Sequence, residues 1–159
     1  YAFTDEERGG RQVSITVWYP AMPPADSTNK SPTRNADPDP GDAPYPLILS
    51  STKIASIFAP SLVSYGFTWA SVDKIDFYYL INTEMIDQPL DILFALNRVA
   101  SSPPEGLEGM IDADHAGVTG YSFDGYNTLA LSGARIAPEY YLAQCPKPDP
   151  TTQAILGSL

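Results

Sequence analysis

The chain has only one cysteine, Cys145, so no disulfide can form within it. Nine lysines and arginines stand against nineteen aspartates and glutamates, which gives a formal net charge of −10. This shortage of basic residues argues against a basic face for nucleic acid or anionic membrane. No apolar run approaches the length of a membrane span, so we expect neither a nucleic-acid partner nor a transmembrane segment. Histidine also occurs only once, as His115.

With 159 residues and 43% hydrophobic content, the chain can bury one core, and we expect a single domain over residues 1–159. Alternation over 11–19 predicts a half-buried strand with a hairpin partner at Phe3–Thr4. Short apolar runs at 46–50 and 67–72 are typical of buried parallel strands. Two proline-rich stretches, 20–45 and 138–152, are expected to be irregular.

Helices are expected between these strands. The first covers 54–65 and ends at Gly66, unless Pro60 delays its start. The second begins at Pro89 and is stopped by the Ser-Ser-Pro-Pro run at 101–104. The residues expected to face inward are Ile54, Ile57, Phe58, Ser61 and Leu62 in the first helix, and Leu90, Leu93, Phe94, Leu96 and Asn97 in the second. Strands that alternate with helices predict a mostly parallel sheet, entered here through antiparallel strands.

The most informative segment is Gly120-Tyr121-Ser122-Phe123-Asp124-Gly125, which directly follows the apolar stretch 116–119. A strand that ends in Gly-x-Ser and turns at once into a helix presents its serine as a nucleophile, because the tight turn exposes the hydroxyl. The helix that follows would end near Gly133. Ser122 also lies at the carboxyl end of a parallel strand, where ligands bind in such sheets. We therefore predict that Ser122 is a catalytic nucleophile.

A family resemblance rests on four segments of the chain: 17–21 (Val-Trp-Tyr-Pro-Ala), 45–50 (Tyr-Pro-Leu-Ile-Leu-Ser), 64–73 and Gly120–Phe123. Together they resemble the dienelactone hydrolase and platelet-activating-factor acetylhydrolase branch of the α/β-hydrolases, over about residues 3–136. The resemblance implies the N-terminal part of an α/β-hydrolase fold and an esterase with a serine nucleophile. Ser122 matches the family's catalytic position, and no other catalytic position is matched.

Two departures from the family pattern concern the oxyanion site. Asp124 stands where the family has glycine, so its side chain is expected to crowd the turn and its charge to oppose an oxyanion. The family's His-Gly after the strand at 46–50 is replaced by Ser-Thr-Lys-Ile. The backbone N–H of Phe123 supplies one oxyanion donor. The second would come from about Ser51 or Thr52.

A serine nucleophile needs a histidine base and an orienting acid, and in α/β-hydrolases both follow the serine in the chain. No histidine follows Ser122. His115 precedes the turn, and about 20 Å of strand would separate the two side chains. We therefore expect the domain to be incomplete at its C-terminal end, with an unpaired apolar sheet edge beyond the nucleophile strand. A second polypeptide fragment, or more of the same chain, would complete the fold and supply the histidine and the acid.

Other polar and aromatic residues have alternative interpretations. Asp73 and Asp76 follow a strand on the ligand side and could line the cleft, or make a helix cap or loop hydrogen bond. The acidic loop at 37–42 lacks the glycine and glutamate of an EF-hand, which favours a solvated turn over a calcium site. The aromatic run at 77–80 fits an acyl-pocket wall or ordinary core equally well.

Two hypotheses about function follow. The first is a serine hydrolase that cleaves a carboxylic ester, with a small-molecule or lipid-like substrate and no metal or organic cofactor. The second is a catalytically inactive relative that serves as a binding or scaffold protein, which Asp124 and the missing His-Gly favour. Reaction with a fluorophosphonate, which labels only an activated serine, discriminates between them.

Overall fold

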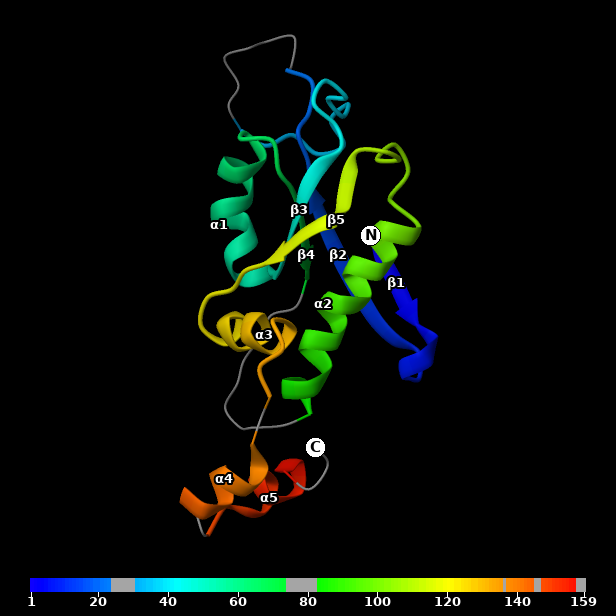
Figure 1. Cartoon of the computed structure of the whole chain (residues 1–159). Helices are drawn as coiled ribbons and strands as arrows, with labels where there is room; N and C mark the ends of the chain where they lie inside the picture. The colour runs from blue at the N-terminus through cyan, green and yellow to red at the C-terminus, as the bar shows by residue number, and fades with distance from the viewer. Residues whose placement is uncertain (24–30, 74–82, 136, 145–146, 157–159) are drawn as a thin grey trace.

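The computed structural model describes residues 1–23, 31–73, 83–135, 137–144 and 147–156 (Figure 1). Its strands form one five-stranded sheet in the order β1-β2-β4-β3-β5. The strands are β1 Ala2–Asp5, β2 Arg11–Trp18, β3 Tyr45–Ser51, β4 Thr68–Val72 and β5 Ile111–Val118. The helices are the 3₁₀ turn η1 Glu6–Arg8, α1 Thr52–Val63, α2 Glu84–Ser101, α3 Phe123–Leu131, α4 Pro138–Gln144 and α5 Pro150–Leu156.

The middle of the sheet is parallel and its first strands are antiparallel. β2 pairs antiparallel with both β1 and β4, whereas β3 pairs parallel with β4 and with β5. The chain is therefore a mixed α/β protein with flanking helices, as the alternation of strand and helix patterns predicts. The carboxyl ends of β3, β4 and β5 meet at one edge, because parallel strands point the same way (Figure 1).

Two helices cover opposite faces of the sheet. One core cluster joins Leu47, Leu49 and Ala70 to Ile92 and Val99 of α2. A second cluster packs α1 against Trp69 and Ile48, the neighbours of those residues along the same strands. Successive side chains of a strand point to opposite faces, so this division places α1 and α2 on different sides (Figure 1).

The predicted inward face of α1 is wrong in part: Leu62 packs against the core, but the residues buried most deeply were not among those predicted. Ala55 and Ala59 are buried against Trp69, whereas Ile57 and Phe58 are exposed. The large indole fills the space under the helix, so alanines are the residues that fit there. A pattern that ranks positions by hydrophobicity selects the larger side chains and rotates the predicted face away from the true one.

The predicted start of α2 at Pro89 is wrong, and so is the alternative that Pro60 delays the start of α1, because both prolines lie inside helices. The start predicted at residue 54 lies within two residues of the observed start of α1. α1 includes Pro60, and α2 begins before Pro89. Pro89 has no N–H for the carbonyl of Met85, four residues earlier. The Tyr126 hydroxyl donates to that carbonyl instead, at 2.9 Å. Burial raises the pKa of Tyr126, so the hydroxyl stays protonated and keeps this bond in mildly alkaline solution.

The prediction of irregular structure for 138–152 is wrong for a related reason. Pro138 and Pro150 are the first residues of α4 and α5. The backbone N–H groups in the first turn of a helix make no hydrogen bond within the helix, so a proline, which has no N–H, is well tolerated there. By contrast, the described part of 20–45 before β3 holds only turns, bends and an isolated bridge between Ala21 and Pro38.

The predicted inward face of α2 is also wrong in part. Phe94 and Leu96 pack against the core, but Leu90, Leu93 and Asn97 are exposed. The buried side includes Asp91, whose side chain is 3% exposed. Arg8 Nη2 and Arg11 Nε each lie 2.8 Å from Asp91 Oδ1, and Arg11 Nη2 lies 2.8 Å from Oδ2. Hydrogen bonding to Asp91 raises the pKa of Arg11. These ion pairs fasten the first hairpin to α2.

Replacing Asp91 with alanine is expected to lower the free energy of unfolding by about 3 kcal/mol, because it leaves partly buried arginines without their counter-ion. Asp87→Ala is the matched control on the same helix. Asp87 is 29% exposed and lies 3.7 Å from Arg11 Nη1, so its loss should cost less than about 1 kcal/mol. Urea denaturation of both variants measures the difference, and equal costs would show that the buried carboxylate has no special role.

β5 begins earlier than predicted, at Ile111, and therefore contains His115. In the described sheet β5 is an end strand that pairs with β3 alone. Residues 114–117 on it are exposed. The edge expected beyond this strand was apolar, whereas the exposed residues of β5 include Asp114 and His115. No helix in the described part of the chain is both long and apolar enough to cross a membrane.

Candidate active site

Ser122 occupies the junction between β5 and α3, as the cap residue before the first helical position. Its backbone has φ 61° and ψ −121°, a region that residues other than glycine rarely adopt. Backbone bonds close the turn around it, from Asp124 N to Tyr121 O at 3.2 Å and from Gly125 N to Ser122 O at 3.0 Å. Ser122 itself is exposed. The sequence thus builds a strained turn that presents a hydroxyl to solvent at the carboxyl end of a parallel strand.

The tightest point of this turn is Gly120. A Cβ built on Gly120 would lie 2.0 Å from the backbone oxygen of Asp124 and 2.1 Å from its carbonyl carbon. The other glycine of the turn, Gly125, has room, because a Cβ there would come no closer than 3.9 Å to Gly120 O. The small residue that this turn requires is therefore the one before the serine. Asp124, which was expected to crowd the turn, has its side chain buried there.

Ser51 and the turn meet directly, although they lie 73 residues apart in the chain. Ser51 is the last residue of β3 and the cap residue of α1. Its hydroxyl donates to the carboxylate of Asp124, and both side chains are buried. Phe123, the first residue of α3, packs its ring 5.0 Å from that of Tyr126. The structure thus brings Ser51, Phe123 and Ser122 to the same edge of the sheet.

A buried polar cluster beneath the turn has no counterpart in the sequence-based prediction. Asn127 Nδ2 lies 3.3 Å from Gln88 Oε1 and 3.5 Å from Asp124 Oδ1. All of these side chains are buried, so α2, α3 and β3 are joined by hydrogen bonds as well as by apolar packing. The available signal was the spacing of Asp124 and Asn127, which places two polar residues on one side of a helix.

His115 is engaged elsewhere. Its Nδ1 lies 2.7 Å from Asp112 Oδ2, and its backbone N–H donates to Asp112 Oδ1 at 3.1 Å. Bonding to His115 lowers the pKa of Asp112. The histidine ring is 79% exposed on the edge strand β5. This local pair gives His115 an ordinary surface role.

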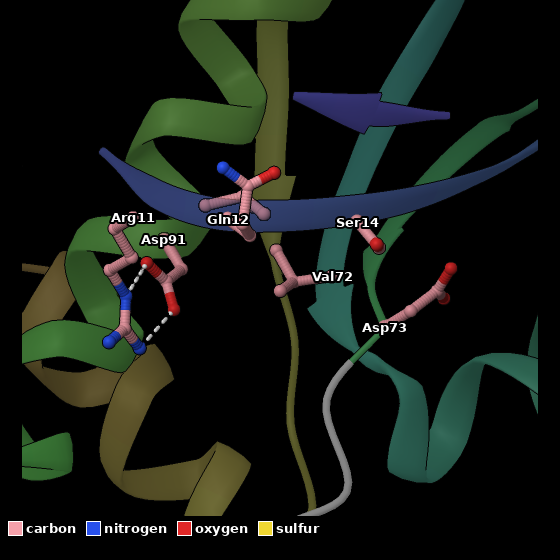
Figure 2. Close-up of a pocket in the computed structure, with 7 residues that line it drawn as sticks. Arg11, Gln12, Ser14, Val72, Asp73 and Asp91 are labelled. Atoms are coloured by element: carbon pink, nitrogen blue, oxygen red, sulfur yellow. Dashed lines mark hydrogen bonds and ion pairs between the residues drawn. The ribbon is translucent and has the colours of Figure 1, made fainter. Parts of the chain in front are cut away.

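A pocket of about 280 Å³ lies where β2, β4 and α2 meet (Figure 2). Arg11 and Asp91 face each other on one side of it, and Ser14 and Asp73 lie on the other. Asp73 accepts a hydrogen bond from Thr16 Oγ1 at 2.6 Å, the loop bond that was one alternative for this residue. Val72 in its wall is the register partner of Ser51, so the pocket adjoins the Ser51 end of the site.

The described residues contain no group of three or more histidine, cysteine, aspartate and glutamate side chains that could hold a metal ion. In the acidic loop, Asp39 Oδ1 accepts from Gly41 N at 2.9 Å, a self-contained turn. Asp76 and the aromatic run at 77–80 lie outside the described residues.

Comparison of the chain with protein-family models, with curated proteins and with solved structures finds no match in any of the three.

Proposed function

We propose that this chain carries the nucleophile of a serine hydrolase of the α/β-hydrolase type, acting on carboxylic esters. The observation that carries the proposal is the backbone of Ser122, a non-glycine residue at φ 61° between a parallel strand and a helix. Strain of this kind costs about 1–3 kcal/mol and persists at functional sites. A sharp strand-to-helix turn of this type is how an α/β-hydrolase exposes its serine.

The proposed reaction is acyl transfer. Ser122 Oγ attacks the ester carbonyl and its proton passes to a histidine base, which returns it to the leaving alcohol. Water then attacks the acyl-serine by the same route and releases the acid. The N–H of Phe123 and an N–H at the β3–α1 junction near Ser51 would donate hydrogen bonds to the oxyanion. An α/β-hydrolase has its oxyanion donors at these two places.

The base and the orienting acid of this mechanism would come from outside the sequence. The one histidine of the chain lies on an exposed edge strand and pairs with Asp112. The exposed edge of β5 offers a place for further strands, which a second segment of polypeptide would add. A small or lipid-like ester would then bind over the carboxyl ends of the strands.

A fluorophosphonate tests the proposal on the full-length protein. We expect a single adduct on the peptide that contains Ser122, found by intact mass and peptide mapping. Heat-denatured protein is the control and should remain unlabelled, because only an activated serine reacts. An unlabelled native protein would favour the binding or scaffold hypothesis over the enzyme.

A further inference from the structure

Asp124 is the residue of the turn that departs most from the family pattern, and its surroundings suggest a role. It lies in the first turn of α3, two residues after Ser122, and is 1% exposed. A buried carboxylate is costly unless hydrogen bonds stabilise it. Ser51, from the end of β3, supplies one such bond across the gap between two elements. The Asp124 side chain therefore links the turn to β3 through this hydrogen bond, called the Asp124–Ser51 tie below.

The Ser51 hydroxyl is committed to this tie rather than to its own helix. A serine at a helix cap usually accepts a hydrogen bond from a backbone N–H of the first turn. Ser51 is the cap residue of α1, yet it makes no such bond with its side chain. Its hydroxyl donates to Asp124 instead. The Ser51 side chain thus links β3 to the turn and does not cap α1.

Asp124 also has hydrogen-bond partners within α3. Asn127 Nδ2 approaches the same carboxylate oxygen at 3.5 Å and also bonds Gln88 of α2. Thr128 Oγ1 donates to the backbone oxygen of Asp124 at 2.8 Å. A carboxylate held in this way has little freedom to move, so it can fix the position of Ser51 relative to the turn.

We propose that Asp124 is a positioning residue that sets the β3–α1 junction against the nucleophile turn, so that N–H groups from both elements converge on one oxyanion. This inference rests on the proposed hydrolase function and deepens it. The oxyanion donors belong to segments far apart in the chain, and a displacement of about 1 Å at such a site can cost about 100-fold in rate. The Asp124–Ser51 bond links those two segments. On this view the carboxylate acts through Ser51 and does not itself touch the substrate.

The test is a double-mutant cycle in the full-length protein, with p-nitrophenyl acetate as substrate. Ser51→Ala and Asp124→Ala should each lower kcat by about 10- to 100-fold and change KM by less than about threefold. The double variant should be no slower than the slower single variant, because both changes break one bond. Asp124→Asn keeps an oxygen that accepts from Ser51, so its kcat should be at least about tenfold above that of Asp124→Ala.

Ser132→Ala is the matched control, since it removes an exposed hydroxyl from the C-terminal end of α3 and should leave kcat unchanged. If Asp124→Ala fails to fold, Ser51→Ala and Asp124→Asn still decide the question. Multiplicative effects in the cycle, or unchanged kcat with lowered stability, would overturn the positioning role. Fluorophosphonate labelling of the wild type distinguishes failure of this inference from failure of the proposed function. If Ser122 is labelled and the variants keep the wild-type kcat, the positioning role alone is refuted. If Ser122 is not labelled, the proposed function is refuted.

Discussion

Replacing Ser122 with alanine in the full-length protein is expected to lower kcat/KM for a short carboxylic ester by about 10⁴- to 10⁶-fold. Removal of the nucleophile leaves only the oxyanion donors and substrate binding to favour hydrolysis, and this residual catalysis is small. The fold should be intact, because Ser122 is exposed and backbone hydrogen bonds close the turn around it. Initial-rate measurements beside circular dichroism check both statements, and a loss of less than tenfold would exclude Ser122 as the nucleophile.

Ser122→Gly is the matched control for backbone strain. Glycine adopts a positive φ without steric cost, so this variant should be as inactive as Ser122→Ala but more stable than it by about 1 kcal/mol. Alanine at φ 61° keeps the strain of the serine. Equal stability of the two variants would mean that the turn stores no strain, which would remove the main support for a dedicated nucleophile position.

The sharp strand-to-helix turn at Ser122 could be predicted from sequence because its physical requirements are local. Small residues are needed where the strand and the helix approach each other, and Gly120 supplies one. The hairpin of β1 and β2 and the buried strand β4 were equally predictable, since alternation and apolar runs are properties of neighbouring residues.

The faces of the helices were not predictable in the same way, because they depend on what lies opposite. Ala55 and Ala59 face inward because Trp69 fills the space beneath them. Asp91 faces inward because Arg8 and Arg11 lie there, 80 residues or so away along the chain. Periodicity assigns charged residues to solvent, and a buried ion pair reverses that assignment.

The same limit applies to the candidate site. Asp124 was expected to crowd the turn, yet it is buried with Ser51 as a partner 73 residues away. No pattern in either segment indicates the other. What local sequence could indicate was the turn itself, with the proposed nucleophile Ser122 and the N–H of Phe123 in it.

Gly120→Ala is expected to lower the free energy of unfolding by about 4 kcal/mol or more, and to abolish reaction at Ser122. The new methyl group would overlap the backbone of Asp124, where real Cβ contacts are never found. Backbone atoms in a hydrogen-bonded turn cannot rotate aside as a long side chain can, so α3 must shift away from β5. That shift would also separate Phe123 from Ser51, since Phe123 belongs to α3 whereas Ser51 belongs to β3, which stays paired with β5.

Gly125→Ala is the matched control, because the same substitution five residues later adds a methyl group where there is room for it. The added methyl group would lie 3.9 Å from Gly120 O, an ordinary contact, and alanine is the better helix former. We expect the stability of Gly125→Ala to stay within about 1 kcal/mol of the wild type, with fluorophosphonate labelling retained. Thermal denaturation of the two variants, followed by labelling of the folded fraction, gives the comparison. Equal tolerance of both substitutions would mean that the strand and the helix do not approach as closely at Gly120 as the turn requires, and the geometry proposed for Ser122 would fail with it.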